Sequence, residues 1–176
     1  MEIPRSAARE LTSVARSAAA PVTQDDNVKV SAIIVEHPPV KPALGYRFDF
    51  KDRSIAFSGD TAPSEAVAKI AKGADVLVHE AMYVPAIETY IRGEIAKGRP
   101  IKFEDLMAHM KADHTPVEDV GRIAQEAGVK TLVLSHLIPA FGDLAADISL
   151  DRRRSEERRV GKECHVVGRS RWSPYH

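Results

Sequence analysis

The sequence has almost no cysteine and no long apolar run, and each of these gaps excludes a class of protein. Cys164 is the only cysteine in 176 residues, so an intramolecular disulfide framework and a cysteine-rich zinc site are excluded. No apolar segment approaches the ~20 residues that a membrane-spanning helix requires. The first residues, MEIPR, lack the apolar stretch of a secretory signal peptide. We therefore predict a cytoplasmic protein without a membrane segment.

The sequence also has no surplus of charge of either sign. It contains 25 Lys and Arg residues and 25 Asp and Glu residues, which argues against a broad surface for nucleic acid or anionic membrane. Six of these basic residues and three of the acidic ones lie from Arg154 onward, so residues 1–153 carry a net charge of −3. The neutral total is therefore the sum of a mildly acidic part and a basic tail.

The tail over 154–176 differs from the rest of the chain. Two runs in it, RSEERRVGKEC and RSRWSPYH, resemble conceptual translations of a common sequencing-adapter DNA, and they occur in the matching order. We interpret the tail as an artefact that carries no functional information, which would leave the natural C-terminus missing. The alternative is a basic arm that binds RNA.

Strand and helix signals alternate from about Asp60 to His136, which indicates a layered α/β arrangement, and we predict one domain over residues 28–150. Apolar periodicity and turn residues predict strands at 28–35, 44–50, 54–57, 76–78 and 131–134, and helices at 64–71, 81–112 (one or two) and 117–127. Thr115-Pro116-Val117-Glu118 has the pattern of a helix start, in which Thr115 caps the helix and Glu118 completes a capping box. Residues 1–27 precede the domain and contain a short predicted helix over Ala7–Ala19.

Polar residues stand where several of these apolar strands end. Asp60, the pair His79-Glu80, and His136 follow strands, and His114 precedes a helix. In layered α/β folds, active sites gather beyond the carboxyl ends of strands. Taken singly, each residue has an ordinary structural explanation as a cap, a turn residue or a hydrogen-bonded histidine at the edge of the core.

Five short motifs, taken together, resemble the metallo-β-lactamase-fold hydrolases of the ribonuclease Z and arylsulfatase-like branch. In chain order they are Glu36-His37-Pro38 with Gly45-Tyr46-Arg47, Phe57-Ser58-Gly59-Asp60-Thr61, Leu77-Val78-His79-Glu80-Ala81, His114-Thr115, and Leu132-Val133-Leu134-Ser135-His136. Each motif is weak alone, but all five follow the order and approximate spacing of the family. The resemblance extends from about residue 28 to 140 and implies a fold that is the C-terminal half of an αββα metallo-β-lactamase sandwich.

The resemblance also implies roles for individual residues. Asp60 matches the aspartate that bridges two zinc ions in the family, and His136 matches the last histidine ligand of the second zinc. His114 matches the histidine that helps to protonate the leaving group in the nuclease branch. His37 and the pair His79-Glu80 match positions that support the site without binding the metal. The implied reaction is endonuclease-type hydrolysis of a phosphodiester, or of a sulfate ester or lactone, by a metal-activated water.

The sequence departs from the family pattern in one large respect. The family's metal site begins with a His-x-His-x-Asp-His motif, whereas none of the seven histidines here forms a His-x-His pair. Two protein ligands are fewer than the three or four that zinc normally takes. We therefore expect a fragment of a dinuclear zinc hydrolase that is inactive alone. The expected substrate is an ester or a phosphodiester, with RNA as one candidate, and the intact protein could be a homodimer. The alternative is a non-catalytic α/β interaction domain in which Asp60 and His136 are structural.

Overall fold

The computed structural model describes residues 18–139 and, as backbone only, the short strand at 163–166. These residues form one sheet with the strand order β1-β2-β3-β4-β5-β6-β7. The strands are β1 (Ala20–Gln24), β2 (Val28–Val35), β3 (Ala43–Phe50), β4 (Ser54–Phe57), β5 (Val76–Met82), β6 (Thr131–Ile138) and β7 (Glu163–Val166). The prediction of a mixed α/β fold is confirmed.

The direction of the strands changes at β4. From β1 to β4 each strand is antiparallel to the one before it, and β4, β5 and β6 then run parallel. Parallel neighbours require a crossover, and helices supply it: α2 (Glu65–Ile70) joins β4 to β5, and α3, α4 and α5 come between β5 and β6. The carboxyl ends of β4, β5 and β6 therefore meet at one edge of the sheet, which is where the predicted polar residues fall.

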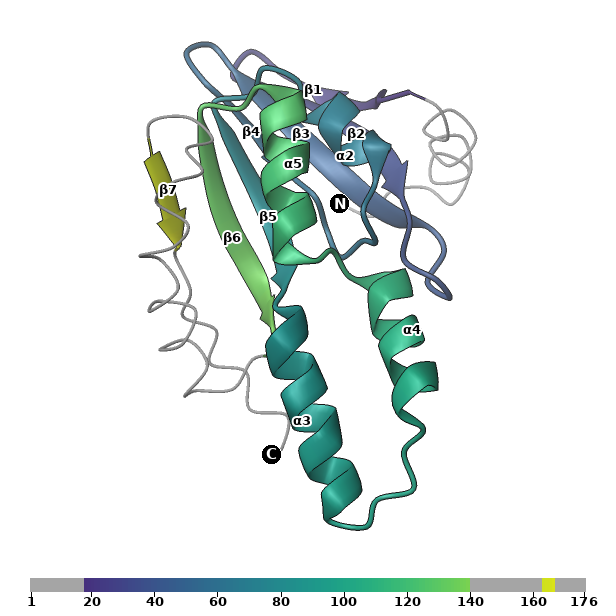
Figure 1. The fold of residues 1–176 in the computed structure, drawn as a ribbon. Helices are drawn as coiled ribbons and strands as arrows, with labels where there is room; N and C mark the ends of the chain where they lie inside the picture. Colours follow the sequence, from purple (N-terminus) through teal and green to yellow (C-terminus); the bar gives the residue numbers. More distant parts are fainter. Residues whose placement is uncertain (1–17, 140–162, 167–176) are drawn as a thin grey trace, which may run out of the picture.

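Two helices, α2 and α5 (Val117–Ala127), cover one face of the sheet (Figure 1). The main core lies between them and the strands, and Ala56, Leu77 and Val120 within it are fully buried. The period of apolar residues in α5 directs Val120, Ala124 and Ala127 into this core. On the opposite face aromatic residues of β3 and β4 contact each other, and Phe57 there is 40% exposed.

A helical hairpin extends from the carboxyl edge of the sheet (Figure 1). It consists of α3 (Val84–Ala96) and α4 (Phe103–Asp113) with a short connection at 97–102. A small apolar cluster, separate from the main core, joins the two helices to the end of β5. It contains Met82, Ile87, Ile91 and Met107. Of the one or two helices predicted around Gly98-Arg99-Pro100, the structure has two.

The predicted start of α5 is wrong in its details. Pro116 occupies the cap position, and no side chain caps the helix. Thr115 lies one residue earlier and uses its hydroxyl elsewhere, as a donor to the carbonyl oxygen of Thr61 at 2.6 Å. A threonine before a proline matches the local pattern of a helix cap, but the hydroxyl of Thr115 bonds to Thr61 and not to the first turn of α5. The predicted helix stop at Gly128 is confirmed, with a left-handed φ of 66°.

The remaining differences concern strand lengths and the ends of the chain. β5 and β6 each extend four residues beyond the predicted ends at Val78 and Leu134. β1 was not predicted, because Pro21 and polar residues hide its alternation. The predicted helix over Ala7–Ala19 lies largely outside the described residues, as does the 154–176 tail apart from β7, so both interpretations stay predictions. In the part of the chain that the structure describes, no helix has the length and apolar character needed to cross a membrane.

Candidate active site

The candidate site lies where β4, β5 and β6 end side by side. Asp60 follows β4, Glu80 lies near the end of β5, and His136 lies near the end of β6. His114 is the residue at which α4 ends, so the helical hairpin returns the chain to the same edge. The structure thus brings together residues that are up to 76 positions apart in the sequence, between Asp60 and His136.

The turn that carries Asp60 depends on Gly59. Its φ is +65°, and a Cβ atom at this position would lie 2.7 Å from the carbonyl oxygen of Leu44. Only glycine allows the chain to pass this close to β3 in a left-handed conformation. Ser58, which is buried, adds a second restraint, since its hydroxyl accepts the backbone N–H of Glu80 at 3.1 Å. Asp60 is therefore held against the end of β5.

Glu80 connects the two loops that carry the polar residues. Its side chain is 1% exposed, and its Oε1 accepts the backbone N–H groups of Thr61 at 3.2 Å and Thr115 at 2.9 Å. A buried carboxylate requires such partners, because an unpaired charge in the interior is costly. One side chain thereby fixes the residue after Asp60 relative to the residue after His114.

His114 faces the second oxygen of the same carboxylate. Its Nδ1 lies 3.3 Å from Glu80 Oε2, and its side chain is 14% exposed. Burial disfavours the charged imidazolium, but the Glu80 carboxylate, with those of Asp60 and Asp113, outweighs burial and raises the pKa of His114 above its ordinary value. The His114 ring therefore holds a proton more strongly than an ordinary histidine does, and its Nδ1 lies beside a carboxylate.

Asp60 and His136 are the exposed pair of the site. Asp60 Oδ2 and His136 Nε2 are 3.5 Å apart, and their side chains are 46% and 51% exposed. His136 has a φ of 43°, where the pairing of β5 and β6 shifts by one residue between Glu80 and Ala81. A positive φ in a residue other than glycine is costly and concentrates at functional sites. This irregularity redirects the His136 side chain relative to the regular part of β6.

The three histidines of the site are close to one another. The ring centroids of His114 and His136 are 5.8 Å apart. His37 approaches His114 edge-on, at 5.5 Å and 87°, and its buried Nδ1 has no hydrogen-bond partner. The predicted grouping of Asp60, His114 and His136 with His37 nearby therefore corresponds to a spatial cluster.

His79 is placed differently from the other predicted site residues. It is fully buried in β5, and its Nδ1 lies 2.7 Å from the carbonyl oxygen of Glu80. Burial lowers its pKa, so the ring stays neutral. Its polar contact is with the backbone at the end of β5, and its buried Nε2 has no hydrogen-bond partner.

Thr61 and Thr115 were not recognised from the sequence as site residues. Both are fully buried, and they join the two loops through the hydroxyl of Thr115 and the Glu80 carboxylate. The only available signal was their position beside Asp60 and His114. Their role depends on a contact across 54 residues of sequence, which no local pattern reports.

The described residues do not complete a zinc site. Carboxylate oxygen and imidazole nitrogen are suitable zinc donors, and Asp60 and His136 provide one of each. Within 18–139, however, no group of three or more His, Cys, Asp or Glu residues is arranged to hold a metal ion. Two donors fall short of the usual three or four, so the described part of the chain supplies at most a share of such a site.

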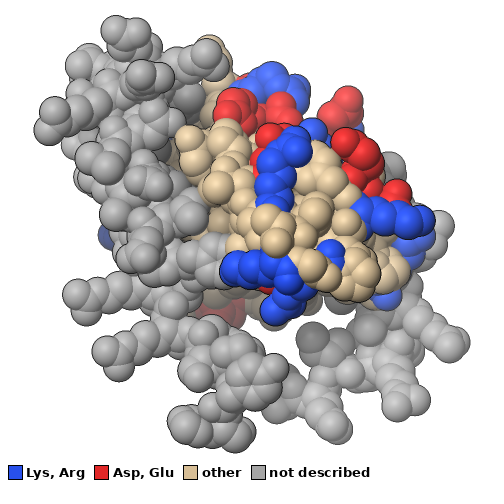
Figure 2. All heavy atoms as spheres, turned by 60° about the horizontal axis from the view of Figure 1, so that its bottom comes forward, with Lys and Arg blue, Asp and Glu red and all other residues tan. Residues whose placement is uncertain are grey.

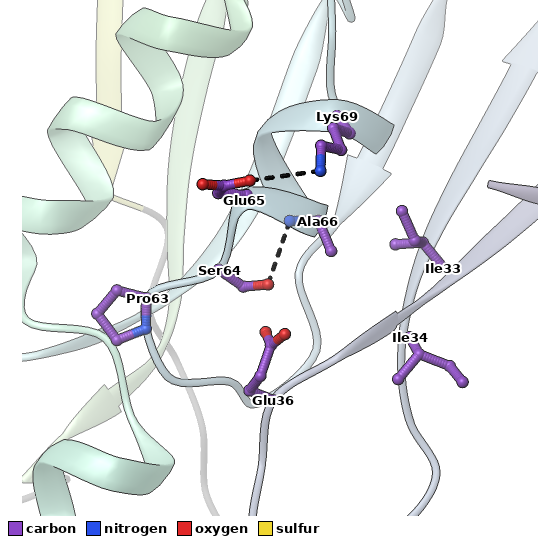
Figure 3. Close-up of a pocket in the computed structure, with 8 residues that line it drawn as sticks. All are labelled: Ile33, Ile34, Glu36, Pro63, Ser64, Glu65, Ala66 and Lys69. Atoms are coloured by element: carbon purple, nitrogen blue, oxygen red, sulfur yellow. Dashed lines mark hydrogen bonds and ion pairs between the residues drawn. The ribbon is translucent and has the colours of Figure 1, made fainter. Parts of the chain in front are cut away.

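A pocket of about 390 Å³ lies beside the site, between the end of β2 and the start of α2 (Figure 3). Its lining includes Glu36, which precedes His37, and Pro63, which follows the Asp60 turn. Glu65 and Lys69 pair with each other across one turn of α2 at 3.4 Å. The lining contains none of the candidate site residues, so this pocket is a neighbour of the site and not part of it.

Comparison with solved structures identifies the fold. The metallo-beta-lactamase fold protein YhfI from Bacillus subtilis matches with a TM-score of 0.57 and 19% identity, over 84% of this chain and 50% of that one. The Zn²⁺-bound PqqB from Methylobacterium extorquens matches with a TM-score of 0.57 and 13% identity, over 85% of this chain and 51% of that one. The chain therefore has the metallo-β-lactamase fold, as the resemblance of its motifs predicted.

The family assignment follows from the sequence comparison. The family model described as "Beta-lactamase superfamily domain" matches residues 3–137, and the chain belongs to this family. The chain is 33% identical over 125 residues to the Ribonuclease Z of Mycobacterium tuberculosis, which covers 70% of the chain and 41% of that protein. It is 36% identical over 108 residues to the Ribonuclease Z of Brevibacillus brevis, and the match covers 61% of this chain and 28% of that protein. The chain thus spans half or less of the curated relatives that it matches.

Proposed function

We propose that this chain carries part of the active site of a metal-dependent hydrolase that cleaves phosphodiester bonds in RNA. The observation that carries the proposal is the cluster of Asp60, His114 and His136 at the carboxyl ends of adjacent strands, with Glu80 behind His114. The names of the relatives, Ribonuclease Z, support RNA as the substrate class.

Asp60 and His136 are the metal ligands in this proposal. They are the exposed members of the cluster, and their donor atoms lie 3.5 Å apart, so both can face a shared ion. Two zinc ions are the proposed cofactor, with further ligands from groups outside the described residues. Zinc supplies a Lewis acid that stabilises negative charge on a phosphoryl oxygen.

His114 is the proposed proton donor to the leaving oxygen. Glu80 Oε2 lies 3.3 Å from its Nδ1, so the carboxylate can stabilise the charged ring while the other nitrogen is left for the substrate. Glu80 and His37 act as positioning residues, since Glu80 holds both loops and the His37 ring lies edge-on to that of His114. His79 has only a supporting role through the β5 backbone.

Zinc titration by calorimetry tests the ligand assignment. We expect D60A and H136A each to weaken zinc binding by at least tenfold, because each removes one of two donors. D52A is the matched control, since Asp52 is an exposed aspartate of the β3–β4 turn that pairs with Arg53. Unchanged zinc affinity in both D60A and H136A would contradict the proposal.

Hydrolysis of bis(p-nitrophenyl) phosphate tests the expectation that this chain is inactive alone. With two donors we expect no zinc-dependent turnover above the buffer rate, and tight binding of two zinc ions would overturn that expectation. If zinc-dependent turnover is found and is lost in D60A, the hydrolase function is supported directly. H114A should then lower the rate by roughly 10²–10⁴-fold while zinc binding is retained.

A non-catalytic α/β interaction domain is the second candidate. The observation that favours it is that Asp60 and His136 pair with each other, as structural residues do. This candidate predicts that D60A and H136A lower the melting temperature of the metal-free chain and leave zinc binding unchanged. The two candidates therefore give opposite results in the same titration.

A further inference from the structure

The helical hairpin joins the candidate site to a distant tip. α3 begins two residues after β5 ends at Met82, and α4 ends next to His114. At 1.5 Å per residue, the 13 residues of α3 place the connection at 97–102 roughly 20 Å from the sheet edge. Both helices therefore start or finish at the site, and their far ends extend away from it (Figure 1).

The tip of this hairpin is basic. Between residues 92 and 102 the chain has four basic residues, Arg92, Lys97, Arg99 and Lys102, against one acidic residue, Glu94. The four basic residues are all exposed, and we call them the basic tip. Figure 2 looks onto this end of the molecule and shows several Lys and Arg side chains around it. The surplus is local, because residues 1–153 as a whole are acidic by three charges.

The basic tip is held in place by contacts that neutralise its charge only in part. Glu94, whose side chain is 7% exposed, pairs with Lys97 Nζ at 2.8 Å and with Arg99 Nε at 2.7 Å. One buried carboxylate thus orients two cations that remain 72% and 66% exposed. The Arg92 guanidinium lies 4.1 Å from the centre of the Phe103 ring, a cation–π contact that limits its motion.

Acidic residues nearby offset part of this charge. Asp105 is 3.8 Å from Lys102, and Glu104 is its exposed neighbour in the first turn of α4. Acidic side chains in this turn are favoured by the helix dipole. The loop from 97 to 101 has no acidic residue, so its positive charge faces solvent.

We propose that the basic tip binds the phosphate backbone of RNA and directs the strand along the hairpin toward His114. This rests on the proposed function and names its docking surface. Preordered Lys and Arg side chains suit phosphate contacts, which position a nucleic acid without selecting its sequence. RNA is favoured over other polyanions because the two helices that carry the basic tip end at the candidate site for phosphodiester cleavage.

Binding of a fluorescent single-stranded RNA of 20 nucleotides, measured by anisotropy in the presence of EDTA, tests the proposal. We expect K97Q/R99Q/K102Q to weaken binding by about tenfold or more. The slope of log K against log salt should become shallower by roughly 2, at about 0.7 for each single-strand phosphate that is no longer neutralised. The matched control is K29Q/K51Q/K72Q, which removes the same charge from exposed lysines of the sheet layer and should change affinity less than twofold.

A second variant changes the affinity in the opposite direction. E94Q replaces the buried carboxylate with a neutral amide, which raises the net charge of the tip by one, so RNA should bind a few-fold more tightly. K102Q alone changes a side chain that is 86% exposed, so it keeps the test valid if the triple variant unfolds. Affinity and salt slope equal to those of the native chain in K102Q and the triple variant would overturn the proposal.

Two further results separate this proposal from its alternatives. Binding to vesicles that contain phosphatidylserine, with the same dependence on the basic tip and no RNA binding, would overturn RNA as the partner. Because the assay contains no metal, its outcome is independent of the zinc titration. Loss of RNA binding in the triple variant together with unchanged zinc binding in D60A would support the basic tip and reject the ligand assignment.

Discussion

The sheet layer and the helical hairpin are stabilised in different ways. In the sheet layer, α2 and α5 pack on strands that lie far apart in sequence, and the core contains fully buried Leu77 and Val120. The hairpin is held by a small apolar cluster that includes Ile91 of α3 and Met107 of α4. The candidate site lies at their junction, because the sheet positions Asp60 and His136 while the hairpin returns His114. The sheet layer is thus held by contacts between segments distant in sequence, whereas the hairpin is held by contacts between two helices that are adjacent in the chain.

The largest effect should come from truncating the core of the sheet layer. Leu77 is fully buried in β5, so L77A should lower the free energy of unfolding of the whole domain by about 2–5 kcal/mol. Ile91 is 2% exposed in α3, and I91A should instead increase hydrogen exchange in the hairpin while sheet amides keep their protection. Equal loss of protection in both regions after I91A would show that they unfold as one unit.

The second effect concerns Glu80, which links the two regions. E80A leaves the buried N–H groups of Thr61 and Thr115 without their acceptor, and each such group costs about 1–3 kcal/mol. We expect a loss of roughly 2–4 kcal/mol in urea unfolding, with less in E80Q because Gln keeps an acceptor oxygen. E80Q and E80A with equal stability would contradict the role of that oxygen.

A smaller effect should follow from the Asp60 turn. G59A forces a side chain into a left-handed conformation and against the Leu44 carbonyl oxygen, at a cost of about 1–3 kcal/mol. Gly73 provides the control, since its φ is +66° but a Cβ atom there would contact nothing within 4 Å. In thermal unfolding, G59A should therefore lose more stability than G73A, and the reverse order would contradict the close approach.

The smallest effect is the pH-dependent contribution of Asp75, just before β5, to the free energy of unfolding. A hydrogen bond from Lys130 and one from the Ser54 backbone lower the pKa of Asp75 to about 2. Because the folded pKa lies below the unfolded one, the stabilisation is complete above about pH 4 and disappears as pH falls through about 2. D75N should therefore be less stable than the native chain at pH 6, with a difference that shrinks on acidification. A pH-independent difference would contradict this linkage.

The sequence predicted the layered fold better than the contacts of the site. Alternating apolar residues identified β2 and helical spacing identified α5, because burial of one face imposes a period of about 2 on a strand and about 3.6 on a helix. The start of α5 was wrong because the Thr115 hydroxyl bonds to Thr61. The pair Asp60 and His136 was predicted from motifs, but their 3.5 Å separation was not available from either motif alone.

The sequence by itself determined the fold class, the strand and helix order and the residue types that gather at the strand ends. Those features depend on local periodicity and on short motifs. Only the tertiary structure decided that Glu80 joins the Asp60 and His114 loops and that the Thr115 hydroxyl bonds to Thr61. These are contacts between segments far apart in the chain, and their geometry is fixed by how the strands and helices pack together.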